Sequence, residues 1–427
     1  MVRWKSTLIA SWLAQICSIV GFALVIPFLP FYVRELGVTD EKAVLLWCGW
    51  GLSTSAGLTM AIVAPIWGVL GDRHGRKLMV MRSMFGGVIV LALMGLVQNV
   101  HQLMALRILQ GALTGTVSAS IALVSSIVPT RRAGFALGLM QTAMFIGNSM
   151  GPWVGGNLAE QVGYRIPFVI AAGFLLVGGL LTAFGVHENF DPNEMVEDEN
   201  GATTIRQVLA ITGFTTMIGL LFMIQFSGSF IGPILPLYIE RISGLHGHAS
   251  SITGNILCLG GIAAAISATL LGLLGDKLGY GRVLVLCTLL TGLTLIPHGL
   301  AQTTHQLMFW RICTMFAGAG TIPAANALIR SMIPRHACGK AFGIVASVGC
   351  LGWGTGPAVG STLAAHFGMR QPFFIVGGFF LLISLAVLIV IPRMQRRIAE
   401  QQVLDAAAEP CCSCTSDSAD SSIAASS

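Results

Sequence analysis

Five ionisable residues lie within the ten-residue segment GVLGDRHGRK, which runs from Gly68 to Lys77. The 29 residues of 43–71 contain no Asp, Glu, Lys or Arg. A carboxylate at the edge of such an apolar stretch is costly unless it is paired or hydrogen-bonded. We therefore predict a conformational latch, against the alternative of a basic anchor that fixes only the orientation of the chain. The residues assigned to it are Gly68, Asp72, Arg73, Gly75, Arg76 and Lys77.

The elements that position this segment follow from the composition. The chain has 427 residues, 54% hydrophobic and only 10% charged, whereas soluble domains carry about 25% charged residues. A spanning helix needs about 20 apolar residues, and long windows without apolar/polar alternation exclude a barrel. We predict an all-α integral membrane protein with twelve transmembrane helices. The uncharged windows are 6–33, 43–71, 83–106, 108–130, 133–159, 166–187, 207–239, 242–275, 283–310, 312–329, 341–369 and 371–392.

The orientation follows from the basic residues. Of 24 Lys and Arg residues, 17 fall on the side that holds both termini and the even-numbered connections. Lys and Arg concentrate in cytoplasmic loops, so both termini are expected in the cytoplasm. The net charge of +6 is then a sign of orientation and does not predict nucleic-acid binding. No residue pattern predicts a metal site or a cofactor.

The chain repeats itself with a period near 205 residues. Pro27 recurs as Pro233, Asp72 as Asp276 and Arg107 as Arg311. Two six-helix halves that start on the same side are related by an axis along the membrane normal. The predicted organisation is an N-terminal bundle at 1–187, an acidic cytoplasmic linker at 188–206, a C-terminal bundle at 207–392, and a basic, then low-complexity and disordered, cytoplasmic tail at 393–427.

Two further patterns fall within the spans. Arg107 opens the fourth expected helix, with Thr114 and Ser118 at helical spacing on the same face. An Arg inside a spanning segment is a functional candidate by default, and here the candidate role is coupling; the alternative is a side chain that reaches the outer interface. The fifth expected helix carries small residues at regular spacing, which let helices approach closely, and a proline that bends it. These residues are Gly138, Gly147, Gly151, Pro152, Gly155 and Gly156.

The segment at 68–77, the pattern beginning at Arg107 and the glycine pattern of 133–159 together resemble the major facilitator superfamily. Within it, the chain is similar to the twelve-helix drug:proton antiporters. The resemblance implies that Asp276 belongs to an eroded second copy of the latch and that the glycine pattern accompanies export by antiport. It also implies a substrate cavity between the halves. The candidate substrate-binding residues are Gln15, Phe22, Thr114, Ser118, Gln141, Phe145, Gln225, Arg311 and Asn326.

The spans lack acidic residues at their middles. If Arg107 and Arg311 face the cavity, its field is positive, so neutral, zwitterionic or anionic amphiphiles are expected over dicationic drugs. We predict a monomeric secondary active exporter of small amphiphilic compounds that uses protons as the coupling ion, with Asp72 as a second coupling candidate. Three alternatives stay open: a dedicated exporter of an anionic metabolite such as a siderophore, a solute-uptake symporter or facilitator on the same fold, and a non-transporting sensor. No soluble region is large enough to predict an enzyme.

Overall fold

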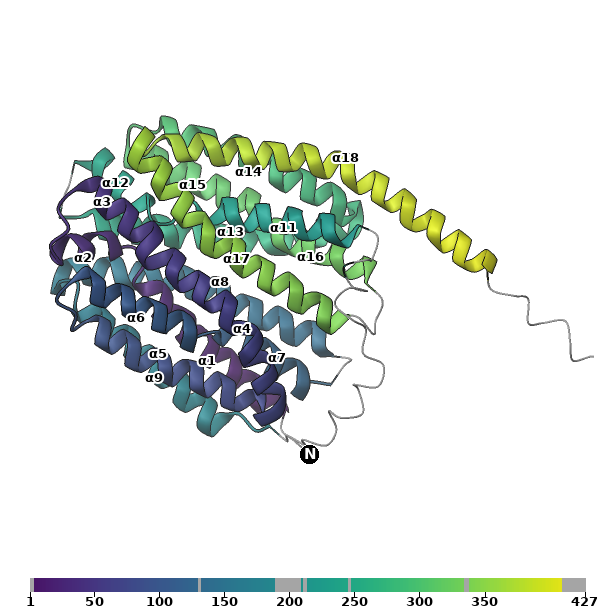
Figure 1. Cartoon of the computed structure of the whole chain (residues 1–427), viewed down its shortest axis with the longest axis horizontal. Coiled ribbons are helices and arrows are strands. Elements are labelled where there is room, and N and C mark those ends of the chain that lie inside the picture. The colour runs from purple at the N-terminus through teal and green to yellow at the C-terminus, as the bar shows by residue number, and fades with distance from the viewer. Residues whose placement is uncertain are drawn as a thin grey trace, which may run out of the picture.

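The fold consists of helices that run between two ends of an elongated bundle (Figure 1). The structure is a computed structural model, and it describes residues 4–129, 132–188, 209, 213–244, 247–333 and 338–408. The described residues of the N-terminal half form α1 (Trp4–Leu24), α2 (Leu29–Glu35), α3 (Glu41–Leu46), the π-helix η1 (Trp47–Thr54), α4 (Ser55–His74), α5 (Arg76–Met94), α6 (Val100–Leu113), α7 (Thr116–Ile127), α8 (Ala133–Val162) and α9 (Ile166–Gly185).

The C-terminal half repeats this order. Its described helices are α11 (Phe214–Ser229), α12 (Leu235–Ser243), α13 (Ala249–Leu278), α14 (Tyr280–Leu300), α15 (Thr304–Gly318), α16 (Thr321–Met332), α17 (Cys338–Phe367) and α18 (Gln371–Ala408). The all-α membrane class predicted from the sequence is confirmed. Ten helical stretches of the described chain are long and apolar enough to cross a membrane. The two remaining windows hold α8 and α11, so each of the twelve windows contains helix.

Local sequence explains where many helices begin. The side chain of Asn99 accepts a hydrogen bond from the Gln102 amide at the start of α6, and Thr303 does the same for Gln306 at the start of α15. Such caps satisfy amide groups that lack a partner inside the helix. The turn between α4 and α5 is made by Gly75, whose φ of 95° favours glycine. The same cap and turn positions recur in both halves, as the sequence repeat predicts.

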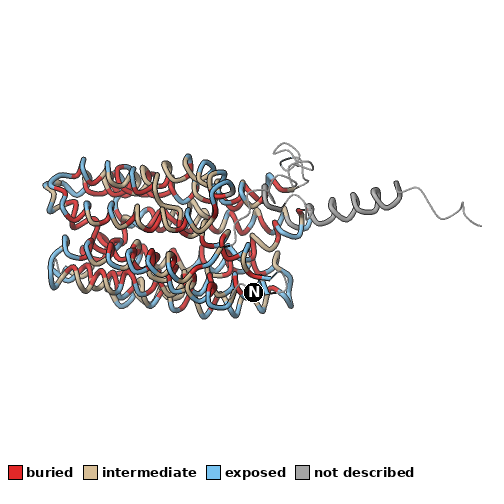
Figure 2. Tube along the Cα trace, turned by 90° about the horizontal axis from the view of Figure 1, so that it is seen from below, coloured by how far each residue is buried: buried red, intermediate tan, exposed pale blue. Residues whose placement is uncertain are grey.

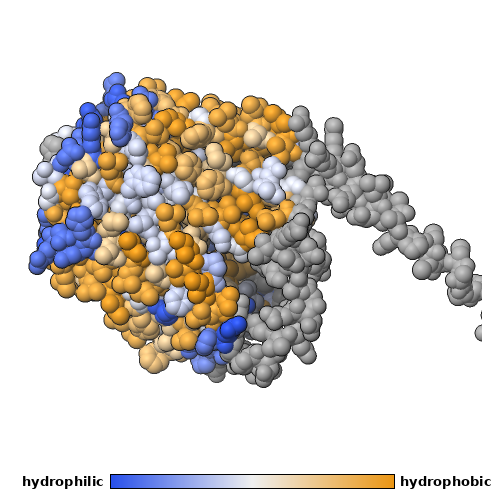
Figure 3. All heavy atoms as spheres, in the orientation of Figure 1, coloured by the Kyte–Doolittle hydropathy of each residue, from blue (hydrophilic) through white to orange (hydrophobic). Residues whose placement is uncertain are grey.

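The surface agrees with a membrane setting. Buried and exposed residues alternate along most helices in Figure 2, so each helix has a packed face and an exposed face. The exposed faces are apolar: Ile62 is 69% exposed and Phe184 is 80% exposed. Apolar atoms cover most of the face in Figure 3, while hydrophilic atoms gather at the end that carries α2, α3 and α12. We call this end the α2 end, and the opposite end, with the α4–α5 turn, the Gly75 end.

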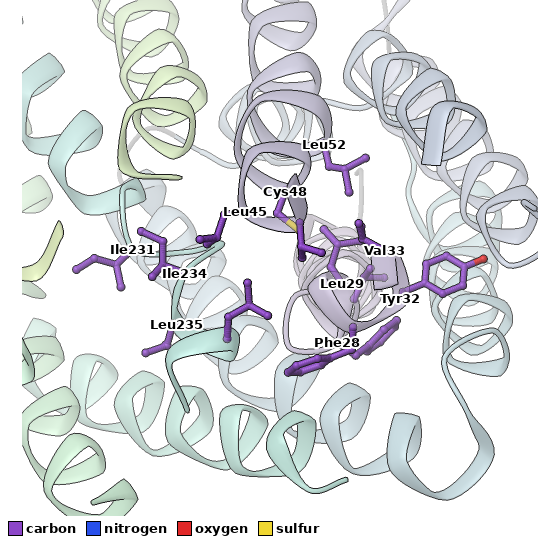
Figure 4. Close-up of a cluster of buried hydrophobic side chains, with 14 of the residues drawn as sticks. Phe28, Leu29, Tyr32, Val33, Leu45, Cys48, Leu52, Ile231, Ile234 and Leu235 are labelled. Carbon is purple, nitrogen blue, oxygen red and sulfur yellow. The ribbon is translucent and has the colours of Figure 1, made fainter. Parts of the chain in front are cut away.

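The buried core connects the halves at the α2 end. Its largest cluster combines α2 and η1 residues such as Phe28 and Cys48 with Ile234 and Tyr238 of the other half. Figure 4 shows side chains of the two halves converging, among them Phe28, Cys48 and Ile234. The three other clusters each stay within one half, and Met140 and Val283 are examples of their members. Among the described residues, the halves therefore share a hydrophobic core at the α2 end.

Two boundaries differ from the sequence prediction. The fourth spanning segment begins at Val100 and not at Arg107, because the cap at Asn99 starts the helix two turns earlier. The last helix does not end at residue 392: α18 continues to Ala408, beyond the rest of the bundle, through a segment expected to be disordered (Figure 1). The charged residues that follow position 392 do not interrupt the helical backbone, so α18 continues past the membrane-spanning window. Residues 409–427 and 189–206 lie outside the described residues.

Candidate functional site

The glycine pattern of the fifth expected helix belongs to α8, and α8 lies at the boundary between the halves. It packs along α13, and its pseudo-symmetric counterpart α17 packs along α3, η1 and α4. A Cβ at Gly254 of α13 would overlap the carbonyl oxygen of Pro152, and a Cβ at Gly57 of α4 would overlap the backbone of Gly354. We call these two contacts the seams. Backbone-to-backbone packing of this kind requires glycine on at least one side.

The same glycine pattern also packs each helix within its own half. Side chains at Gly147, Gly151 and Gly155 would collide with α1, while Gly156 faces α13. In α17, Gly352 and its equivalents contact α11 in the same way. Gly138 differs from the other four glycines of the pattern, because a Cβ there would meet nothing within 4 Å. The glycine pattern therefore lets α8 pack closely against both α1 and α13.

Charged residues tie the halves together at the α2 end. An Nη1 atom of Arg34 on α2 lies 2.6 Å from an Oε2 atom of Glu240 on α12, and the Glu240 side chain is 8% exposed. Their positions differ by 206, the offset that relates Pro27 to Pro233. The pair therefore joins equivalent positions of the two repeats. The sequence analysis did not pair Arg34 with Glu240, although their equal offset was a usable signal.

A second polar group crosses the seam between α8 and α13. Glu160 accepts a hydrogen bond of 2.8 Å from the Ser251 amide, and its carboxylate lies 3.2 Å from Nδ1 of His248. Burial raises the pKa of the nearby Tyr164 phenol, and a hydrogen bond with Ser250 opposes that shift. On the other seam, Trp50 donates to the Thr362 hydroxyl at 2.9 Å. All of these contacts lie at the α2 end.

The predicted latch lies at the Gly75 end. The two carboxylate oxygens of Glu188 accept hydrogen bonds from the backbone amides of Arg76 (3.0 Å) and Lys77 (2.7 Å). Lys77 donates from Nζ to the Ala183 carbonyl, and Arg76 donates from Nη1 to the carbonyl of Ala122. These partners belong to the N-terminal half. Glu188 was assigned only to the linker in the sequence analysis, because its role depends on α9 ending beside α5.

The other predicted latch residues are placed as follows. Gly68 has open space around its Cβ position. The side chain of Asp72 lies outside the described part of the structure, although its backbone is in α4. In the second copy, the Tyr280 hydroxyl donates to Asp276 at 2.5 Å, and Gly279 has a φ of 89°, close to that of Gly75. The latch function stays a prediction.

Two arginines lie inside the bundle at equivalent positions. Arg107 donates from Nη1 to Oε1 of Gln110 at 3.2 Å, and it lies close enough to Cys48 to act on it electrostatically. Arg311 is similarly close to His298. The Nε atom of each guanidinium is buried and has no hydrogen-bond partner among the described residues. Within a membrane, such donors are functional candidates.

The remaining predicted substrate residues are spread over several environments. Gln15 is 1% exposed, and both of its amide atoms lack a described partner, as does Oδ1 of Asn326. Phe22 packs near Gly87 of α5 within its own half and against the core cluster that the halves share. Gln225 lies beside Gly349 of α17. The others are half-buried or exposed: Thr114, Ser118, Gln141 and Phe145. Among the described residues, no group of three or more His, Cys, Asp or Glu could hold a metal ion.

Two repeated bundles of membrane-spanning helices that share a core at one end are the plan of a large class of membrane transporters. The sequence model of the Major Facilitator Superfamily matches the chain twice, over residues 11–223 and 217–413. The chain belongs to this superfamily, and it is a multi-pass transporter and not an enzyme.

Known relatives and solved structures agree with this assignment. The chain is 36% identical to the multidrug resistance protein MdtG of Salmonella dublin over 381 residues, covering 88% of the chain and 93% of the relative. Its identity to MdtG of Citrobacter koseri is 37% over the same shares. The human organic anion transporter MFSD10 superposes with a TM-score of 0.70 at 16% identity, covering 91% of the chain and 100% of that structure. A bacterial homologue of the lysosomal transporter Spinster, inward-facing and unoccupied, also has a TM-score of 0.70, at 14% identity, with 93% and 98% covered.

Proposed function

We propose that the protein is a secondary active exporter of small amphiphilic compounds, working by proton antiport in a bacterial inner membrane. The carrying observation is that α8 and α17, the two helices with the repeated glycine pattern, are those that pack across the halves. The similarity to MdtG proteins supports drugs as cargo. In this proposal, residues 1–187 and 207–392 move as two bundles joined by 188–206, and the monomer is the working unit.

The mechanism follows from the seams. The core, the Arg34–Glu240 pair and the Glu160–His248 contact all close the α2 end. With both termini in the cytoplasm, this end faces outward, so the structure corresponds to a state closed to the outside. Rocking of the halves about the middle of the seams would break these contacts, and the latch residues around Gly75 would then form contacts at the opposite end. Each cycle would therefore exchange contacts at one end for contacts at the other.

The function is tested by expressing the chain in a bacterial host that lacks its own efflux pumps. We expect lower susceptibility to amphiphilic drugs and faster efflux of a fluorescent dye, with the efflux lost when a protonophore collapses the proton gradient. Unchanged susceptibility and dye efflux would contradict the export of drugs. Dye accumulation driven by the proton gradient would instead support the uptake symporter. A dedicated metabolite exporter would leave drug susceptibility unchanged and release one anionic compound.

Neutralising the predicted latch should slow the cycle. Because a hydrogen bond to a charged group contributes about 1.5–3 kcal/mol, Asp72→Asn is expected to lower the initial rate of export about tenfold or more. Asp40→Asn is the matched control, since the Asp40 side chain accepts only a local hydrogen bond from the Ala43 amide and asparagine caps helices equally well. Equal export by the Asp72 variant and this control would rule out the latch.

A further inference from the structure

The fourth spanning segment is interrupted inside the bundle. Helix α6 ends at Leu113 and α7 begins at Thr116, and between them Gly115 has a φ of 136°. The Thr114 amide still donates to Gln110, and the Ala119 amide donates to Gly115. The amides of Thr116, Val117 and Ser118 have no acceptor among the described residues. Three N–H groups are thus free at the start of a 12-residue helix that follows the break.

A tryptophan on the neighbouring helix holds this break. In a continuous helix, the Thr116 amide would donate to the carbonyl of Ala112, four residues earlier. That carbonyl instead accepts a hydrogen bond of 2.7 Å from Nε1 of Trp67 on α4. The interruption is therefore part of the packing of α4 against α6, which occupies the carbonyl that the Thr116 amide would otherwise bind.

The side chain at the break also lacks a partner. Thr116 is 3% exposed, and its Oγ1 atom has no hydrogen-bond partner among the described residues. A buried hydroxyl without a partner is unfavourable in a protein and more so in a membrane. The equivalent segment of the other half is also interrupted, between the end of α15 at Gly318 and the start of α16 at Thr321, although Gly320 there has a φ of −80°. Thr321 is also 3% exposed and its hydroxyl is also unpartnered.

The charge around the break is positive. No Asp or Glu occurs between Arg73 and Ala159 in the sequence. The guanidinium of Arg82 on α5 lies over the ring of Trp67, 3.4 Å from its centroid, so a cation sits directly behind the side chain that holds the break. The Nε and Nη1 atoms of Arg82 are buried and have no described hydrogen-bond partner. The positive end of the α7 dipole adds to this field.

We propose that the N-terminus of α7 binds a carboxylate of the transported substrate. The free amides of α7 and the Thr116 hydroxyl donate to the carboxylate, and Arg82 supplies the balancing charge. Half-helix N-termini inside a membrane suit anionic groups for these reasons. Ser118 in the same turn is exposed, which leaves the turn open to a ligand. The inference rests on the proposed export function and names a chemical class for its cargo.

The test compares two dyes that differ only in this group: rhodamine B, which carries a carboxylate, and its ethyl ester. Full-length protein is reconstituted in proteoliposomes, and a pH gradient across the vesicle membrane drives transport of each dye. In Thr116→Val, the concentration of rhodamine B for half-maximal transport rises about tenfold, since a hydrogen bond to a charged group is lost. The value for the ester stays within about twofold. Arg82→Gln gives the same selective loss and serves if Thr116→Val does not fold.

Thr288→Val is the matched control, because Thr288 is fully buried but its hydroxyl donates to the Leu284 carbonyl of its own helix. The half-maximal concentrations of both dyes should be unchanged in this variant. The proposal is overturned if the wild type transports both dyes and each of the variants Thr116→Val and Arg82→Gln changes the half-maximal concentrations of the two dyes equally or not at all. If the wild type transports neither dye, the export function fails along with this inference. The two failures are therefore distinguishable.

Discussion

Export is expected to fall about 5- to 150-fold when Gly254 is replaced by valine, because overpacking a close helix contact costs about 1–3 kcal/mol. The new side chain would collide with the carbonyl of Pro152, which is backbone and cannot rotate away. Each helix of this seam packs well inside its own half, so the variant should still fold. What the variant loses is stability of the closed α2 end, so the state that closes this end is populated less and each cycle becomes slower.

Cys48 reports on this closure directly. It is 1% exposed and lies in the core shared by the halves at the α2 end. In Gly254→Val, a maleimide should modify Cys48 faster than in the wild type, as measured by mass spectrometry of the peptide that contains it. Gly378→Val is the control, because a Cβ at Gly378 meets nothing within 4 Å. Wild-type labelling and export in Gly254→Val would mean that the seam does not govern closure.

The fold was largely predictable because a membrane removes most structural choices. Uncharged windows must become helices, and the repeat then places equivalent residues in equivalent surroundings. Tyr32 and Tyr238 illustrate this: their hydroxyls donate to the carbonyls of Met94 and His298, at 2.9 and 3.0 Å. Both contacts stay within one half, where the repeat dictates the geometry.

The candidate site was less predictable because its contacts depend on how the halves meet. Arg34 and Glu240 occupy equivalent positions of the repeat, but the repeat alone does not say that these positions meet across the boundary between the halves. The break at Gly115 was hidden for another reason, since Thr114-Gly115-Thr116 carries no charge and helices in membranes tolerate glycine. The Glu188 contact required knowing where α9 ends. In each case the missing information is the relative placement of elements.

Reversing the charge of Arg34 is expected to lower export about 30- to 100-fold, which corresponds to about 2–3 kcal/mol. Breaking a fully buried ion pair costs about 3–5 kcal/mol. The Arg34 side chain is 31% exposed, so we expect the lower value of about 2–3 kcal/mol for this pair. In Arg34→Glu, two carboxylates face each other where the halves meet. The α2 end should then open, and maleimide should reach Cys48 faster.

The double variant Arg34→Glu/Glu240→Arg distinguishes loss of the ion pair from a general loss of stability. Because the two positions are equivalent in the repeat, exchanging the charges preserves the ion pair across the boundary, and we expect most of the export to return. The control is the pair formed by Arg165 and Glu35, whose side chains are 53% and 41% exposed and lie in one half. Exposed pairs contribute only about 0–1 kcal/mol, so Arg165→Glu should cost little export. If the double variant is no better than Arg34→Glu, the two charges do not act as a pair in closing the α2 end.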